Sequence, residues 1–342
     1  MSAQETDIAI IGAGPVGLFA VFECGMLKMR CQVIDCLDAI GGQCTALYPE
    51  KPIYDIPGFP RVEAAELIAH LAEQAAPFDP VYVLGQQVQA LSEHNGRWRV
   101  ATSTGTAIDA RAVIIAGGSG AFGPNRPPLP GIADYEGKSV FYAVQRREAF
   151  RGKRVVIAGG GDSALDWAVS LAEVAEKVYV VHRRAKFRGA PETVARLHAL
   201  AEAGANADNG IELVIPYQLH GLEGGNGQLT AVTVESLDGG TRRLEADVLL
   251  PFFGLSMDLG PIATWGLELD YHHIRIDPAT CQTNAPGIFA IGDVATYPGK
   301  LKLILCGFSE AALAAHAAYK LVHPDEALHW EYSTTKGVPG RP

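Results

Sequence analysis

Short apolar runs and helical periodicity alternate along this chain. The apolar run at 7–11 predicts a strand, the pattern at 16–27 predicts a helix, and the run at 31–35 predicts a second strand that ends in an acid. A similar order returns later, where the run at 154–158 leads into a helix and the run at 177–181 follows it. Strands that alternate with helices favour an α/β class.

Further segments extend both repeats. The spacing of apolar residues predicts an amphipathic helix at 64–76 and an Ala-rich helix at 309–321. Additional strands are expected in the apolar or alternating runs at 81–84, 98–100, 112–118, 212–215, 229–235, 247–253 and 287–293. The last residues of the chain are polar and aromatic and show no periodicity.

The order of these segments indicates two domains. The Pro- and Gly-rich stretch 122–131 predicts a linker, and 254–261 is expected to return the chain to the first domain. We therefore expect a discontinuous first domain, 1–123 and 255–342, with a second domain, 124–254, inserted in it. The first would carry a C-terminal extension from about 322 to 342. A length of 342 residues allows each domain its own core.

Composition narrows the class of function. An apolar share of 48% with 19% charged residues is typical of a globular enzyme, and a net charge of −10 argues against a nucleic-acid partner. No apolar run is long enough for a membrane span, and the polar N-terminus lacks the pattern of a signal peptide, so a cytoplasmic protein is expected. The six cysteines form no CxxC and no zinc-like pairs, which predicts free thiols and no metal site.

A glycine fingerprint, Gly12-Ala-Gly14-Pro-Val-Gly17, follows the first strand. In such a turn the first glycine permits the sharp bend, the second lets backbone approach a pyrophosphate, and the third lets the helix pack on the strand. Asp35 stands at the end of the next strand, where a carboxylate can bind a ribose diol and would repel a 2′-phosphate. The first repeat therefore suits FAD or NAD rather than NADP.

A second fingerprint, 159–164 (GGGDSA), opens the later repeat. No acid follows its second strand, and a basic cluster stands there instead. Guanidinium groups bind phosphate with two hydrogen bonds, so the cluster predicts a site for the 2′-phosphate of NADP, with a solvated basic turn as the alternative. We expect NADP contacts from Gly161, Asp162, Ser163, His182, Arg183, Arg184 and Arg188. The two repeats together predict FAD and NADPH.

At this point the chain resembles the two-dinucleotide-binding flavoprotein reductases, since 116–118 (AGG) and Gly292-Asp293 accompany both fingerprints. The 153–164 and 182–188 segments are most similar to the thioredoxin reductase branch. That branch uses a CxxC ahead of its second fingerprint, where this chain has Tyr142 and Gln145, so dithiol exchange is unavailable there. The glutathione reductase branch uses two cysteines in a C-x4-C motif. Here Cys44 occupies the first of these positions, but Pro49 occupies the second, so no disulfide can form there.

The segment 40–60 (IGGQCTALYPEKPIYDIPGFP) closely resembles the thioredoxin reductase-like ferredoxin/flavodoxin–NADP reductases, and the resemblance spans nearly the whole chain. It implies two Rossmann-like domains with three-layer ββα architecture, and a homodimer. It also implies that Tyr48 stacks on one face of the flavin and that Tyr332, or as second choice His329, covers the other. The implied FAD contacts are Gly12, Gly14, Pro15, Gly17, Asp35, Gly42, Gln43, Tyr48, Val88, Asp293 and Ser333.

The expected function is therefore a ferredoxin (or flavodoxin)–NADP reductase, in which NADPH delivers two electrons to the flavin as a hydride and the flavin passes them on one at a time. Hydride transfer needs no acid–base residue, and the sequence offers no convincing nucleophile or triad. Stacked rings must move aside for the nicotinamide, so we expect gating, with hinges at 122–131 and 254–261. The candidate cations for docking an acidic ferredoxin are Arg126, Lys300, Lys302 and Lys336.

Two other functions remain open from the sequence. The first is an NADPH-dependent flavin reductase with another acceptor, such as a quinone, oxygen or a small disulfide. The second is a flavin-binding regulatory protein that uses its redox state as a signal. The arginines of the second repeat and the full flavin signature of the first favour an enzyme over a regulator.

Overall fold

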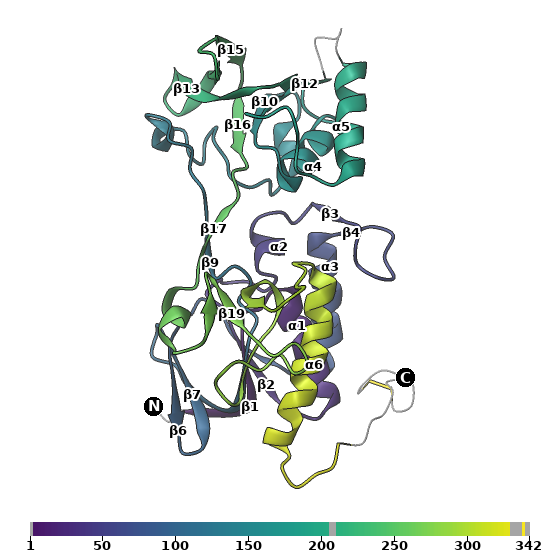
Figure 1. Ribbon diagram of the computed structural model, residues 1–342, viewed down its shortest axis with the longest axis vertical. Coiled ribbons are helices and arrows are strands. Elements are labelled where there is room, and N and C mark those ends of the chain that lie inside the picture. Colours follow the sequence, from purple (N-terminus) through teal and green to yellow (C-terminus); the bar gives the residue numbers. More distant parts are fainter. Residues whose placement is uncertain (1–2, 205–209, 329–336, 339–342) are drawn as a thin grey trace. The chain divides into compact units, whose positions relative to one another are not determined.

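The structure is a computed structural model, and it describes residues 3–204, 210–328 and 337–338. The chain forms two compact units. The first combines Met1–Phe122 with Met257–Pro342, and the second is Gly123–Ser256. Figure 1 shows the helices and strands of each unit.

The first unit is built on a seven-stranded sheet in the order β5-β2-β1-β8-β7-β6, with β20 also paired to β8. The pairs that β1 makes with β2 and β8 are parallel, and Ile10 stands opposite Val33 on one side and Ile114 on the other. The strands are β1 (Gln4–Ile11), β2 (Cys31–Ile34), β5 (Val81–Val83), β6 (Val88–His94), β7 (Arg97–Thr102), β8 (Ala107–Ile115) and β20 (Ile288–Ala290).

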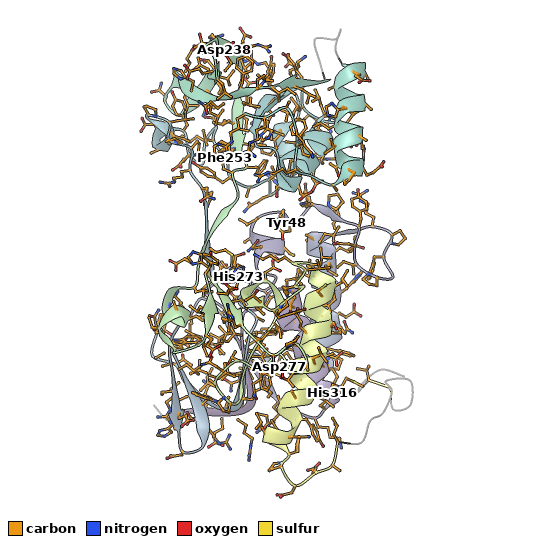
Figure 2. The ribbon with its side chains drawn as sticks, in the orientation of Figure 1. Tyr48, Asp238, Phe253, His273, Asp277 and His316 are labelled. Atoms are coloured by element: carbon orange, nitrogen blue, oxygen red, sulfur yellow. The ribbon has the colours of Figure 1, made fainter. Side chains whose placement is uncertain are left out.

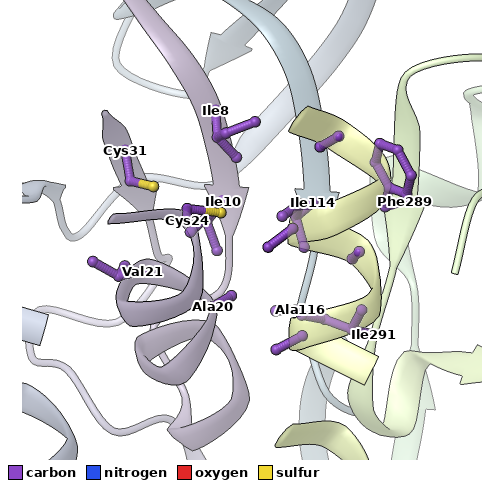
Figure 3. Packing of buried hydrophobic residues seen from close by; sticks show 14 of the residues in the cluster. Ile8, Ile10, Ala20, Val21, Cys24, Cys31, Ile114, Ala116, Phe289 and Ile291 are labelled. Carbon is purple, nitrogen blue, oxygen red and sulfur yellow. The ribbon is translucent and has the colours of Figure 1, made fainter. Parts of the chain in front are cut away.

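Three longer helices cover this unit: α1 (Pro15–Met26), α3 (Ala64–Ala75) and α6 (Ile304–Val322). α1 packs against both α3 and α6. Figure 3 shows the core between sheet and helices, where Ile8 and Ile10 belong to the same buried cluster as side chains of α1 and Phe289 of β20. These interior positions are fully apolar because both faces of the parallel strands are covered.

Helix α6 begins at Ile304, earlier than the helix expected at 309–321. Gly307 interrupts the apolar pattern of its first turns, and glycine lowers helix propensity. The structure explains its presence: a Cβ on Gly307 would lie 2.4 Å from Cγ2 of Val16, so only glycine lets α6 approach α1 this closely. The tertiary contact therefore outweighs the local preference.

Smaller elements complete the first unit. The short helix α2 (Gln43–Ala46) and the strand pair β3 (Pro52–Ile53) and β4 (Val62–Glu63) lie between β2 and α3 in the chain. A three-stranded sheet holds β18 (Leu269–Asp270), β19 (His273–Arg275) and β21 (Ala295–Thr296). Single 3-10 turns occur at η1 (Ala76–Phe78), η4 (Gly260–Thr264) and η5 (Gly292–Val294).

The second unit contains a four-stranded parallel sheet in the order β12-β11-β10-β16 and a three-stranded antiparallel sheet β13-β14-β15. Helices α4 (Asp162–Leu171) and α5 (Pro191–Ala203) follow β10 and β11 in the chain. The 3-10 turns are η2 (Ile132–Asp134) and η3 (Arg147–Phe150). The strands are β10 (Arg154–Ala158), β11 (Lys177–Val181), β12 (Gly210–Val214), β13 (Tyr217–Gly225), β14 (Gln228–Ser236), β15 (Thr241–Glu245) and β16 (Val248–Pro251).

The two stretches that connect the units are extended. β9 (Ala121–Pro124) and β17 (Leu255–Asp258) pair as a two-stranded sheet, where the sequence indicated a linker and a return segment. The predicted α/β class is confirmed, because the main sheet of each unit contains parallel strands joined through helices. In the first unit, the antiparallel pairs β6–β7 and β7–β8 extend this sheet.

Candidate functional site

A cavity of about 300 Å³ opens in the first unit, at the carboxyl ends of the parallel strands. Open parallel sheets bind ligands at this edge. The cavity brings together most of the residues that the sequence marked for FAD. These are Gly12, Gly14, Pro15, Asp35, Gly42, Gln43, Tyr48, Val88 and Asp293.

The glycine turn after β1 has one open position between two crowded ones. Gly12 has φ +115°, and a Cβ there would lie 2.4 Å from the carbonyl oxygen of Ala116. A Cβ on Gly17 would lie 2.0 Å from the carbonyl oxygen of Gly12, so Gly17 packs the helix on the turn although it does not line the cavity. Around Gly14, at the start of α1, no atom lies within 4 Å of a Cβ position. The turn therefore leaves room for a ligand at the helix N-terminus, where the helix dipole attracts phosphate.

Asp35 lies directly after β2 and connects the strand end to the glycine turn. One carboxylate oxygen accepts a hydrogen bond from the Ala13 amide at 2.6 Å, and the other accepts one from the Leu37 amide at 2.9 Å. An ionised carboxylate offers about four acceptor sites, so it can also accept from ribose hydroxyls. The next residue, Cys36, is an exposed thiol that also lines the cavity.

Tyr48 follows α2 (Figure 2). Its side chain contributes to the cavity wall. Its hydroxyl oxygen lies 3.9 Å from Sγ of Cys44, which also lines the cavity. Burial raises the pKa of the Tyr48 hydroxyl far above its usual value, and burial raises the pKa of the Cys44 thiol to about 11. Both groups therefore remain neutral in the physiological range, and Cys44 is no thiolate nucleophile. Tyr48 also packs against a hydrophobic cluster beside α3, so it serves the core as well as the cavity.

Another part of the cavity wall comes from segments distant in sequence. Gly292 and Asp293 line the cavity from η5, and the Gly292 amide donates to Glu310 of α6 at 2.7 Å. Several other lining residues were not expected from the sequence. Cys36 lies two residues after β2 and Gln86 three residues after β5. Residues at the ends of parallel strands often contact ligands, so this position was a signal that could have located them. The missed residues include Cys36, Gln86, Gln87, Leu259, Pro261, Ile262, Lys302, Leu303 and Ile304.

The glycine turn of the second unit repeats this backbone plan. Gly159 has φ +156°, and its Cβ would lie 2.7 Å from the carbonyl oxygen of Phe252 and 3.0 Å from Cβ of Ala164. Gly161, at the start of α4, has nothing within 4 Å of a Cβ position. Asp162 and Ser163 are exposed in the first turn of α4, and the Asp162 carboxylate accepts from the Ala190 amide at 2.9 Å. This turn also leaves its helix N-terminus accessible.

His182 differs from the neighbouring arginines because its side chain is buried. Its side chain stacks on Phe187 with ring centroids 5.4 Å apart, and the residue is 9% exposed. A Cβ on Gly160 would lie 2.4 Å from the His182 ring, so the imidazole packs against the glycine turn. Burial lowers the pKa of His182, which makes it a neutral packing group at pH 7.

Arg183, Arg184 and Arg188, by contrast, are exposed. The Arg188 amide donates to the Gly160 carbonyl oxygen at 2.7 Å and joins the arginine segment to the glycine turn. The three guanidinium groups therefore lie on a loop anchored next to the accessible start of α4. An anion held at that helix start would lie near several positive charges.

The cations that the sequence predicts for ferredoxin docking differ in their exposure and in their partners. The expectation for Lys300 is wrong, because its side chain is 6% exposed and forms an ion pair with Glu310. Lys302 is exposed, and its Nζ lies 2.7 Å from Nε2 of His273. Arg126 pairs with Glu136 at 2.9 Å. Tyr332, Ser333, His329 and Lys336 lie outside the described residues.

The dithiol positions contain no thiol. Tyr142 donates its hydroxyl hydrogen to Glu136 at 2.7 Å, and all six cysteines of the chain are free thiols at other positions. In the part of the chain that the structure describes, no group of three or more His, Cys, Asp or Glu side chains could hold a metal ion. Within the same ranges, no helix combines the length and apolar character needed to cross a membrane.

Residues 6–319 match the model of the pyridine nucleotide-disulphide oxidoreductases. The chain belongs to this family. Among the relatives of this oxidoreductase, a ferredoxin–NADP reductase of Paramagnetospirillum magneticum is 65% identical over 340 residues, 99% of either chain. A ferredoxin–NADP reductase of Rhodospirillum rubrum is 62% identical over 342 residues, which is 99% of this chain and 98% of the relative.

Solved structures show the same fold for this oxidoreductase. Thioredoxin reductase of Lactococcus lactis superposes with a TM-score of 0.79 at 24% identity and covers 93% of this chain and 99% of its own. Thioredoxin reductase of T. acidophilum gives a TM-score of 0.79 at 24% identity, over 93% of this chain and 98% of its own. The predicted fold of two Rossmann-like domains is thereby confirmed.

Proposed function

We propose that this chain is an enzyme that passes electrons from NADPH through FAD to a ferredoxin or flavodoxin. The proposal rests on two observations together: the cavity of the first unit, and the presence of Tyr142 and Gln145 where a dithiol reductase has its two cysteines. The cavity has the glycine turn, the acid and the tyrosine expected of an FAD site, and Tyr142 stands where a dithiol reductase needs a cysteine. The relatives that match almost the whole chain are named ferredoxin–NADP reductases, which supports the same acceptor.

The first domain predicted from the sequence, 1–123 and 255–342, corresponds to the first unit and would hold FAD. The open backbone at Gly14 would approach the pyrophosphate, and Asp35 would accept from the ribose diol. Asp293, another lining residue, would face the ribityl and phosphate arm, while Gly42, Gln43 and Val88 complete the enclosure. The residues present fit this group because the accessible helix start and the neighbouring acid match a diphosphate next to an unphosphorylated ribose.

The second domain predicted from the sequence, 124–254, corresponds to the second unit and would hold NADPH. Gly161, Asp162 and Ser163 stand at the accessible start of α4, where a pyrophosphate gains from the helix dipole. Arg183, Arg184 and Arg188 would bind the 2′-phosphate, and exposed guanidinium groups are free to form paired hydrogen bonds with it. His182 would support this loop through packing rather than touch the phosphate.

Bound FAD supplies the chemistry that converts hydride transfer into one-electron steps. The protein's own residues would orient the cofactors and exclude water. Tyr48 would cover one flavin face as a neutral ring, because burial raises the pKa of its hydroxyl and prevents ionisation. Tyr332 or His329 would cover the other face. Backbone rotation in the connecting strands β9 and β17 would accompany turnover. We further propose a homodimer, as the family resemblance implies, and a cytoplasmic location, as the sequence pattern predicts.

The test compares acceptors in one assay. Purified enzyme is supplied with NADPH and either ferredoxin, with cytochrome c as reporter, or thioredoxin, with a dithiol reagent as reporter. We expect ferredoxin-dependent reduction and thioredoxin activity at background. Turnover of thioredoxin would overturn the interpretation of Tyr142 and Gln145. If the enzyme reduced only a quinone or oxygen, that compound and not ferredoxin would be its acceptor.

A further inference from the structure

Glu310 is a buried carboxylate that the proposed chemistry does not use. It lies on α6, its side chain is 3% exposed, and it does not line the cavity. One carboxylate oxygen accepts from the Gly292 amide at 2.7 Å. The other accepts from the Tyr297 hydroxyl at 2.8 Å and from Nζ of Lys300. These three donors compensate the cost of burying the carboxylate, because an isolated charge is strongly unfavourable in a protein interior.

Lys300 is equally enclosed, with its side chain 6% exposed. Its Nζ contacts the Glu310 carboxylate and lies 5.5 Å from the centre of the Tyr297 ring. The two charges compensate each other, so removing one would leave the other buried and unpaired. Breaking such a pair from one side is far more harmful than removing both charges together.

The three donors belong to segments that form the cavity wall. Gly292 immediately precedes Asp293, and both line the cavity. Tyr297 and Lys300 lie in the stretch between β21 and α6, which continues into the lining residues Lys302, Leu303 and Ile304. One side chain therefore connects the Gly292–Val294 turn, the stretch before α6 and α6 itself. Figure 1 shows these segments in the C-terminal part of the first unit.

We propose that Glu310 and Lys300 are positioning residues that set this wall of the cavity and thereby control how firmly it retains FAD. The inference rests on the proposed function, because it takes FAD as the occupant of the cavity. Glu310 fixes the Gly292 amide and so the direction in which Asp293 faces the ligand. Lys300 fixes the start of the stretch that delivers Lys302–Ile304 to the wall. A second layer of hydrogen bonds of this kind holds contact residues in the productive geometry.

The test uses the holoenzyme and four variants. Glu310→Gln keeps the shape and an acceptor oxygen but removes the charge, and Lys300→Met keeps the chain length but removes the cation. The double variant Glu310→Gln/Lys300→Met buries no charge. Lys320→Met changes an exposed lysine on the same helix and is the matched control. The rate of FAD release after dilution is followed by flavin fluorescence, at a temperature well below unfolding.

Each single variant should release FAD about tenfold faster than the parent enzyme, because a hydrogen bond to a charged group is lost or left uncompensated. The double variant should recover much of the retention, and Lys320→Met should match the parent. The flavin absorption band should shift in the single variants, while NADP⁺ binding stays unchanged because it belongs to the second unit.

Unchanged FAD release in Glu310→Gln would overturn the inference. So would faster release that only follows a lower thermal midpoint and gives no recovery in the double variant, because that pattern is one of general stability. If the parent enzyme itself retains no FAD, the proposed function fails, and that outcome is visible before any variant is made.

Discussion

In the first unit the glycine turn after β1 faces a cavity, whereas in the second unit the turn after β10 is followed by an exposed arginine loop. The backbones are alike: Gly12 and Gly159 pack against a neighbouring carbonyl oxygen, and Gly14 and Gly161 are open. The residues at the end of the second strand differ. Asp35 is held by two backbone amides, while Arg183 and Arg184 project from the loop.

This difference separates two tasks that a fingerprint alone leaves combined. The shared glycine plan makes room for a diphosphate at a helix start, which any dinucleotide provides. The strand end then selects the ribose, because an acid repels a 2′-phosphate and guanidinium groups attract it. The enclosure also differs, since the first turn shares its cavity with segments from both ends of the chain. A tightly retained cofactor and an exchangeable one need such different surroundings.

The largest effect should come from the crowded glycines. Gly17→Ala places a Cβ 2.0 Å from the Gly12 carbonyl oxygen, and backbone cannot move aside easily. We expect it to lower the free energy of unfolding by about 2 to 3 kcal/mol, as overpacking does. Gly14→Ala, where the space is open, should leave unfolding nearly unchanged and reduce the FAD content. Denaturant unfolding measures both, and equal stability of the two variants would contradict the division of roles.

The arginine loop should show the next largest effect. Arg183→Ala/Arg184→Ala removes two guanidinium groups that would bind a 2′-phosphate, so kcat/KM for NADPH should fall about a hundredfold while kcat/KM for NADH stays constant. Arg196→Ala is the control, because Arg196 is an exposed arginine of α5 that pairs with Glu173. A parallel loss for NADPH and NADH would show that the loop does not read the 2′-phosphate.

The acid of the first unit should matter less. Asp35→Asn keeps one acceptor for the backbone amides but loses the charge and one acceptor site for the ribose. FAD should leave the holoenzyme a few-fold to about tenfold faster, as expected for one weakened hydrogen bond. Asp38→Asn, an exposed acid three positions along, should release FAD at the parent rate. Equal rates for both variants would remove Asp35 from the ribose site.

The smallest effect should be the pH response of His182. Burial lowers its pKa in the folded chain, so below about pH 6.5 the unfolded chain binds a proton that the folded chain refuses. The free energy of unfolding should therefore fall as the pH falls. His182→Asn does not titrate, and its thermal midpoint should decline less between about pH 7.5 and about pH 5.5 than the parent's. His273 and His316, whose pKa values are also lowered, are present in both proteins and cancel. Identical slopes would show that His182 contributes nothing.

Much of this fold is encoded locally. The strands β1 and β10 follow from apolar runs, and their glycine turns follow from the spacing of glycines, because both signals act over a few residues. The strands β13 and β15 and the helix α5 were not predicted. β13 alternates half-buried and exposed positions and carries three glycines, so its pattern is weak. Its pairing with β14 supplies what the local sequence lacks.

The site was predictable where a residue follows a strand or a glycine and unpredictable where a distant partner decides. Lys300 shows the limit. A lysine in a Pro- and Gly-containing stretch is normally exposed, and that is the safest expectation from sequence. Its burial depends on Glu310, which lies ten residues further along the chain within α6, and on the packing of α6 against α1. Such pairing is a property of the folded core, which no short pattern contains.

The exposed thiol of Cys36 gives the first unit a built-in chemical reporter. Among the free cysteines, Cys24, Cys31, Cys44 and Cys281 are buried and Cys306 is half-buried, whereas Cys36 is exposed beside Asp35 on the cavity wall. Partial desolvation of its sulfur and the nearby Asp35 raise the pKa of Cys36, so alkylation at neutral pH is slow enough to time. A ligand that fills the adenosine end of the cavity would shield this sulfur, and the rate of labelling would then report occupancy without any engineered probe.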